Sequence, residues 1–194
     1  PKEENSFAPA LCNRIDRNTG GIVIAAKNAE ALRILNEKIR DREIEKFYLC
    51  AVSGRPRPAS GRLENYLFKD AKKNQVFIKD KPEPGCKTAV TEYRVLCSKG
   101  QLSLVECRLL TGRTHQIRAQ MAHAGWPLLG DGKYGRERFN KDFGENGQAL
   151  YSYRLRFEFL TDAGALEYLR GKEFQVERVD FAEKYFGVTE LNFE

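Results

Sequence analysis

"CKTAVTEYRVLCSKGQLSLVECRLL", residues 86–110, contains two runs rich in β-branched and apolar residues, separated by Ser98-Lys99-Gly100. Such runs predict strands, and a three-residue connection with a glycine available for a left-handed position predicts a turn between them. The stretch therefore predicts a long antiparallel hairpin between strands that are neighbours in the sequence.

Further strands are expected on both sides of this hairpin. Residues 22–26 and 45–54 form apolar or aromatic runs, and residues 149–160 alternate polar and apolar side chains. Strands outnumber helices and pair locally, so we predict an α+β fold built on a mixed, largely antiparallel sheet.

Two helices and two loops complete the prediction from pattern. Asn28 is expected to cap a helix in which apolar residues recur at spacings of three and four, and a short closing helix is expected at residues 179–187. The basic stretch "RPRPASG" (55–61) and the polar residues 134–148 are expected to be exposed loops.

Composition indicates one soluble domain spanning residues 1–194. Apolar content is 41% and charged content 31%, and there is no run of about 18 apolar residues that would cross a membrane. Residues 1–5 do not resemble a signal peptide, and the five cysteines contain no C-x-x-C pair, so we expect reduced thiols in a cytoplasmic protein. A net charge of +6, with arginines gathered in loops, fits either a nucleic-acid partner or a solvated basic surface.

A second dense stretch, "LLTGRTHQIRAQMAHAGWPLLGDGKYG" (109–135), predicts a short helix that Thr114 caps and Gly125 ends. Ile117 and Met121, four residues apart, should face the core. His115, Arg118 and Arg113 should then lie toward one edge of a cleft.

The spacing of residues in the sequence excludes several common kinds of functional site. Gly125 and Gly130 have the separation of a P-loop, but Asp131 stands where its lysine would be. His115 and His123 are eight residues apart, too far for a one-turn metal pair, so no metal site is expected. What remains is Asp16, flanked by arginines in "NRIDRNTGG", for which a purely structural ion pair stays open as an interpretation.

The segments "NRIDRNTGGIVIAAK", "EKFYLCAVSG" and "LLTGRTHQIRAQMAHAGWPLLGDGKYG" resemble, in order, the three sequence motifs of the RluA-type pseudouridine synthases. This family isomerises uridines in RNA, chiefly in large-subunit ribosomal RNA. The resemblance covers residues 12–160 and implies a sheet in two halves, flanking helices, a central active-site cleft and no cofactor.

The resemblance also implies roles for individual residues. Asp16 matches the catalytic aspartate, and Arg14 matches the arginine that helps to displace the target base from its stack. Tyr48 matches the tyrosine that packs against the bound base, and Arg118 the arginine that forms an ion pair with the aspartate. The other substrate-binding candidates are Ile117, Arg113 and His115.

The sequence departs from the family pattern in three places. Asn13 and Gln120 stand where the family often has histidine, and we expect both to support the site without acting in catalysis. The family's opening segment, with a Lys-Pro turn before the acidic motif, is not found in this sequence, so a fragment of the catalytic domain is one expectation.

Three functions therefore remain open. The leading hypothesis is a cytoplasmic, monomeric RNA pseudouridine synthase acting on large-subunit ribosomal RNA, with a synthase acting on tRNA as its variant. The second is an RNA-binding fragment without catalysis, and the third is a hydrolase that uses Asp16 with His115 and releases free uracil.

Overall fold

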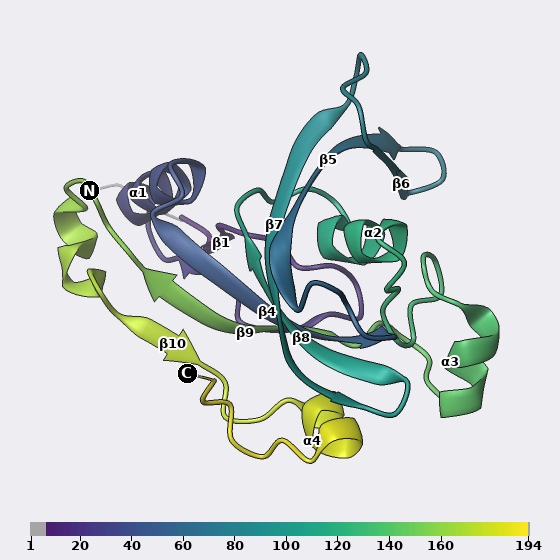
Figure 1. Ribbon diagram of the computed structural model, residues 1–194. Coiled ribbons are helices and arrows are strands. Elements are labelled where there is room, and N and C mark those ends of the chain that lie inside the picture. The colour runs from purple at the N-terminus through teal and green to yellow at the C-terminus, as the bar shows by residue number, and fades with distance from the viewer. Residues whose placement is uncertain (1–6, 194) are drawn as a thin grey trace.

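An eight-stranded sheet forms the centre of the computed structural model, which describes residues 7–193 (Figure 1). The strand order is β10-β9-β4-β8-β7-β5-β6, and β2 adds to β9 outside this path. All of these pairs are antiparallel except β2 with β9, which is parallel, so the predicted α+β class with a mixed, largely antiparallel sheet is confirmed. Residues 1–5, interpreted above as lacking a signal peptide, lie outside the described residues.

The strands of the large sheet are β2 (Gly20–Gly21), β4 (Ile44–Ser53), β5 (Ser60–Asp70), β6 (Gln75–Lys79), β7 (Lys87–Lys99), β8 (Leu102–Leu109), β9 (Leu150–Phe157) and β10 (Glu173–Gln175). A separate pair consists of β1 (Ala10–Leu11) and β3 (Ala25–Ala26). The helices are α1 (Ala29–Arg40), α2 (Gln116–His123), α3 (Glu137–Phe143), a 3₁₀ helix η1 (Gly164–Leu169) and α4 (Asp180–Phe186).

The predicted hairpin is β7–β8, but its turn is shorter than expected. Lys99 pairs with Leu102, which leaves a two-residue turn of Gly100 and Gln101, with Gly100 at a φ of 59°. Ser98 and Lys99 belong to β7 because a two-residue turn that begins with a left-handed glycine matches the twist of the flanking strands and lets the ladder continue to its edge.

Other predictions hold in part. Strands β4 and β9 and helices α1 and α4 form where expected, and the Asn28 side chain caps α1 by accepting the Ala31 N–H at 2.8 Å. The prediction of one strand over residues 22–26 was wrong. The Ile22 N–H donates to Ser152 O on β9, whereas Ile24 O accepts from Cys12 N beside β1, so two different sheets share this run.

The polar stretch 134–148 was predicted to be a loop, but it contains α3. The basic stretch 55–61 is exposed at both of its arginines, although its last two residues already belong to β5. Strands β5 and β6 were not expected from pattern.

The two faces of the sheet are covered by different elements. Ile117 and Met121 of α2 pack with Tyr48, Cys50 and Cys107 on one face, as predicted for the two α2 residues. On the other face, Val179 and Ala182, at and within α4, pack with Leu49, Leu104 and Tyr153. Figure 1 shows α2 beside β5 and β6, whereas α4 lies near the β7–β8 turn. The α2 face carries the site described next.

Candidate active site

A cavity of about 690 Å³ opens between the loop after β1, the end of α1, strand β4 and the loop that joins β8 to α2. Its lining includes five of the seven residues proposed for the site from sequence, namely Arg14, Asp16, Tyr48, Arg113 and Ile117. His115 and Arg118 do not line it. The structure thus gathers side chains that lie far apart in the sequence around one space.

The Asp16 loop is held from both sides. Thr19 N donates to Asp16 O at 3.0 Å, and Asn18 between them has a φ of 66°, which closes a tight turn. Across the loop, the Gln148 side-chain amide donates to Arg17 O at 2.6 Å and to Thr19 Oγ1 at 3.1 Å. Asp16 therefore sits on a braced turn and not on a free loop.

The two glycines after this turn let the chain approach β9 closely. Gly21 has a φ of 117°, and a Cβ placed on it would lie 2.1 Å from Ser152 O. No L side chain fits that position without moving the backbone. Gly20-Gly21 thereby anchors the turn that carries Asp16 to strand β9.

Arg118 has two carboxylate partners, and the stronger is not the one expected. Its Nε donates to Asp131 Oδ2 at 2.7 Å and its Nη2 to Asp131 Oδ1 at 3.1 Å, whereas Nη1 lies 3.8 Å from Asp16 Oδ2. The predicted ion pair with Asp16 exists, but the bidentate pair that fixes the guanidinium is with Asp131. Sequence reasoning missed this role, although it had placed Asp131 within the second dense stretch.

Asp131 is itself fixed in a buried pocket. It is 1% exposed, and its Oδ1 also accepts the backbone N–H groups of Lys133 and Tyr134. Burial acts to raise the pKa of Asp131, but the bonds from Arg118 and the backbone outweigh it, so the pKa lies below its usual value. Asp131 is therefore a charged anchor for Arg118.

Tyr48 lies at a β-bulge, where the β4–β9 register shifts between Phe47 and Tyr48. The extra residue of this bulge is Tyr153 on β9, because Phe47 pairs with Arg154 and Tyr48 with Ser152, so Tyr48 keeps the regular alternation of β4. Burial, to which the Asp16 charge adds, raises the pKa of Tyr48 to about 12, so its phenol stays protonated at neutral pH. Tyr48 thus offers an apolar ring next to Asp16.

His115 precedes α2 in a left-handed conformation, with a φ of 52°, and the predicted Thr114 cap does not form. Its Nδ1 lies 2.7 Å from Tyr134 Oη, which accepts the Val76 N–H at 2.9 Å. Burial and the charge of Arg118 lower the pKa of His115, so a neutral ring is favoured at neutral pH. His115 is thus linked to β6 through the Tyr134 hydroxyl, which bonds to both His115 and Val76.

Asn13 and Gln120 have supporting positions, as the sequence suggested. Asn13 Oδ1 accepts the Ile24 N–H at 2.8 Å. Gln120 is buried, accepts from the Thr91 hydroxyl at 2.7 Å and donates to Ala89 O at 3.1 Å. These bonds attach the acidic loop to the segment before β3 and α2 to neighbouring strands, while Asn13 Nδ2 is buried without a hydrogen-bond partner among the described residues.

The arrangement provides the Asp16 carboxylate, a fixed arginine beside it and an aromatic wall, while the second carboxylate of the lining, Glu45, is paired with Arg108. Asp16 is a quarter exposed, while Arg118 is 8% exposed at its side chain, so the cation stays in place and the carboxylate meets the cavity. Within residues 7–193, no cluster of three or more His, Cys, Asp or Glu side chains offers a metal site, and no helix has the length and apolar character of a membrane span. The site is suited to carboxylate chemistry on a planar ligand.

Residues 1–123 match the family model described as RNA pseudouridylate synthase. The chain is 32% identical over 190 residues to ribosomal large subunit pseudouridine synthase D of Borreliella burgdorferi, covering 97% of this chain and 56% of that protein. It is 37% identical over 150 residues to an uncharacterized RNA pseudouridine synthase of Bacillus subtilis, covering 77% and 48%. The chain thus spans about half the length of these curated relatives.

The fold has counterparts among solved structures. The human RNA pseudouridylate synthase domain containing 1 superposes with a TM-score of 0.72 at 22% identity, over 95% of this chain and 76% of that one. The corresponding domain containing 4 gives a TM-score of 0.68 at 23% identity, over 88% and 71%. At this identity the likeness concerns the fold.

Proposed function

Because the chain belongs to the RNA pseudouridylate synthase family, we propose that it converts uridine in RNA to pseudouridine, with Asp16 as the catalytic carboxylate. In this isomerisation the N1–C1′ bond breaks, the uracil rotates, and a C5–C1′ bond forms, while C5 loses a proton and N1 gains one. Asp16 acts on the nucleoside as nucleophile or as base.

One observation carries the proposal: Asp16 faces the cavity while a buried, doubly bonded arginine lies 3.8 Å from it. Arg118 thereby places a fixed positive charge beside the carboxylate that acts on the nucleoside in either role. Tyr48 and Ile117, on the same wall, supply apolar surface against which a planar base can pack. Apolar walls also limit the access of water, which would otherwise turn isomerisation into hydrolysis.

The base must leave its stack to reach Asp16, because the carboxylate lies inside the cavity. Extrusion of a nucleotide costs a few kcal/mol, which contacts to the flipped base and the backbone offset. Arg14 is exposed at the cavity and has no ion-pair partner among residues 7–193, so it is free to occupy the gap that the base leaves. Relatives named as large-subunit enzymes support large-subunit ribosomal RNA as the substrate.

The test is pseudouridine mapping after incubation of total RNA from cells lacking this protein with the wild type or with Asp16→Asn. Pseudouridine is detected by carbodiimide derivatisation and reverse transcription. We expect new sites in large-subunit ribosomal RNA with the wild type and none with the variant, whose RNA affinity stays within a few-fold because shape is kept. Isomerisation by the variant would exclude Asp16 as the reacting group.

The same incubation, with RNA binding and released uracil measured as well, separates the alternatives. Sites confined to tRNA would change the substrate and keep the chemistry. Binding without any new site would identify a binding fragment, and release of free uracil would identify a hydrolase. The hydrolase hypothesis paired Asp16 with His115, but His115 does not line the cavity and its Nδ1 is bonded to Tyr134.

A further inference from the structure

Lys38 on α1 and Lys46 on β4 have contrasting surroundings. Lys38 is 1% exposed, and its ammonium contacts Glu43 Oε2 at 2.6 Å, Thr161 O at 2.9 Å and Thr161 Oγ1 at 2.6 Å. Lys46 is partly buried, yet no hydrogen bond or ion pair links its ammonium to any residue between 7 and 193. Lys46 Nζ is not among the fully buried atoms that lack a partner, so it reaches the cavity, where no described protein group holds its charge.

Lys46 belongs to the wall of the cavity that contains Asp16. It lies on β4 two residues before Tyr48, on the same face of the strand, and its register partner on β8 is Leu109. Its Nζ is close to the β8–α2 loop, because a Cβ placed on Gly112 would lie 3.4 Å from it. Burial lowers the pKa of Lys46, in agreement with an ammonium that lacks a compensating charge.

The carboxylates that line the cavity already have partners. Asp16 faces Arg118, and Glu45 pairs with Arg108 at 3.1 Å. The other charged side chains of the lining are basic: Arg14, Arg40, Arg42 and Arg113. The charge that this part of the cavity lacks is therefore negative.

We propose that Lys46 binds a backbone phosphate of the RNA, next to the nucleotide whose base packs against Tyr48. This assignment rests on the proposed function for the identity of the ligand. Positions 46 and 48 on one strand are about 6.6 Å apart, the scale of a single nucleotide, so one ligand reaches both. An ammonium is a compact point charge suited to phosphate, and Gly112 leaves the space beside it open.

The first test is RNA binding by Lys46→Met. The probe is a fluorescent RNA stem-loop with uridines in its loop, titrated over a range of salt in the Asp16→Asn background so that no turnover intervenes. We expect about tenfold weaker binding, as for loss of one charge-assisted hydrogen bond, and a salt slope reduced by about 0.7–0.9. Lys46→Arg should recover most of the affinity.

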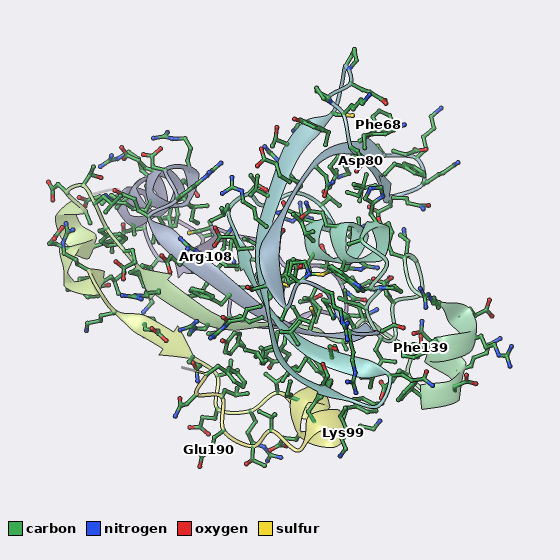
Figure 2. All side chains as sticks on the ribbon, viewed as in Figure 1. Phe68, Asp80, Lys99, Arg108, Phe139 and Glu190 are labelled. Atoms are coloured by element: carbon green, nitrogen blue, oxygen red, sulfur yellow. The ribbon has the colours of Figure 1, made fainter. Side chains whose placement is uncertain are left out.

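Lys99→Met is the matched control, because it removes the same charge from an exposed site near α4, far along the sheet from the cavity (Figure 2). The RNA affinity of Lys99→Met should stay within twofold of that of the parent protein, which carries Asp16→Asn alone. Equal losses in Lys46→Met and Lys99→Met would show a general charge effect and overturn the proposal. So would a parent protein whose RNA binding does not depend on salt.

The second test leaves the protein intact. Replacing single phosphates around each loop uridine by neutral methylphosphonates should reproduce the tenfold loss at one position, and Lys46→Met should lose nothing more with that RNA. If the loss of affinity from Lys46→Met adds in full to the loss from the methylphosphonate at every position tested, Lys46 does not contact a phosphate. If both tests show that Lys46 binds a phosphate of the RNA but the wild-type protein makes no pseudouridine, the proposed function is wrong and the phosphate site is still supported.

Discussion

Asp131→Asn is the change that most directly tests how the site is held together. The substitution keeps the size and shape of the side chain but removes the negative charge that meets Arg118 in a buried pocket, where Asp131 is 1% and Arg118 7% exposed. Among residues 7–193, Asp16, at 3.8 Å, would remain as the only carboxylate that forms an ion pair with the guanidinium.

The expected loss of stability follows from the bonds that survive. An asparagine whose carbonyl takes the place of Oδ1 still accepts from Arg118 Nη2, Lys133 N and Tyr134 N. Its NH₂ group, however, faces Arg118 Nε, which in the wild type donates to Oδ2 at 2.7 Å, so two donors oppose each other. Breaking a buried pair costs about 3–5 kcal/mol, and the surviving bonds place this variant near 3 kcal/mol. For a chain of this size, that corresponds to a fall in Tm of about 6–12 °C.

Urea unfolding measures the difference, first at pH 7 and then at lower pH. The pKa of Asp131 is lowered in the folded protein, so its stabilisation is present above the unfolded value of about 3.9 and is lost as the pH falls through the folded value. The Asp131→Asn variant has no carboxyl at this position and would lack that dependence. The difference in the free energy of unfolding between wild type and Asp131→Asn should therefore become smaller below about pH 4.

Two further variants set the scale. Asp16→Asn removes the longer, more exposed partner of the same arginine and should cost less than about 1 kcal/mol. Glu137→Gln breaks a fully exposed pair with Lys141 and should cost less still. If the free energy of unfolding of Asp131→Asn lies within about 1 kcal/mol of the wild-type value, Asp131 does not anchor Arg118. The same conclusion follows if Asp16→Asn is less stable than Asp131→Asn.

Gly21→Ala should destabilise the fold by at least about 2 kcal/mol in the same urea assay, because the new Cβ meets Ser152 O at a positive φ, whereas Gly132→Ala, with open space around it, should be nearly neutral. A neutral Gly21→Ala would mean that β2 does not lie this close to β9. Arg14→Ala should slow single-turnover isomerisation more on a structured stem-loop than on a short unstructured RNA, because extrusion costs more there, whereas Tyr48→Ala should slow both alike. Equal Arg14→Ala defects on the two RNAs would leave Arg14 as a phosphate contact instead.

Sequence predicted best what local pattern determines. The Asn28 cap, strand β4 and the β7–β8 hairpin follow from spacing, residue type and turn chemistry over a few positions. The family resemblance added residues that no local pattern connects, such as Asp16 and Tyr48, and both line the cavity.

Partner choice across the fold was beyond the sequence. Arg118 has two aspartates beside it, at 2.7 Å and 3.8 Å, and only the folded geometry distinguishes the bidentate contact of Asp131 from the longer contact of Asp16. The strand expected at residues 22–26 failed for a similar reason, because β9 and β1 compete for its backbone groups. Lys46 gave no signal in a chain with 33 basic residues, since its significance lies in the partner that it lacks.

The parallel pairing of β2 with β9 has a consequence for the order of events during synthesis. The turn that carries Asp16 rests on Gln148 and on the backbone of Ser152, so the earliest of the three motifs to be translated gains its support only after the latest has been made. At about 5–20 residues per second, the 136 residues from Arg17 to Ser152 take about 7–27 s to add. Throughout that interval the nascent chain has the Asp16 carboxylate without the strand that positions it, and the site closes only when β9 has left the ribosome.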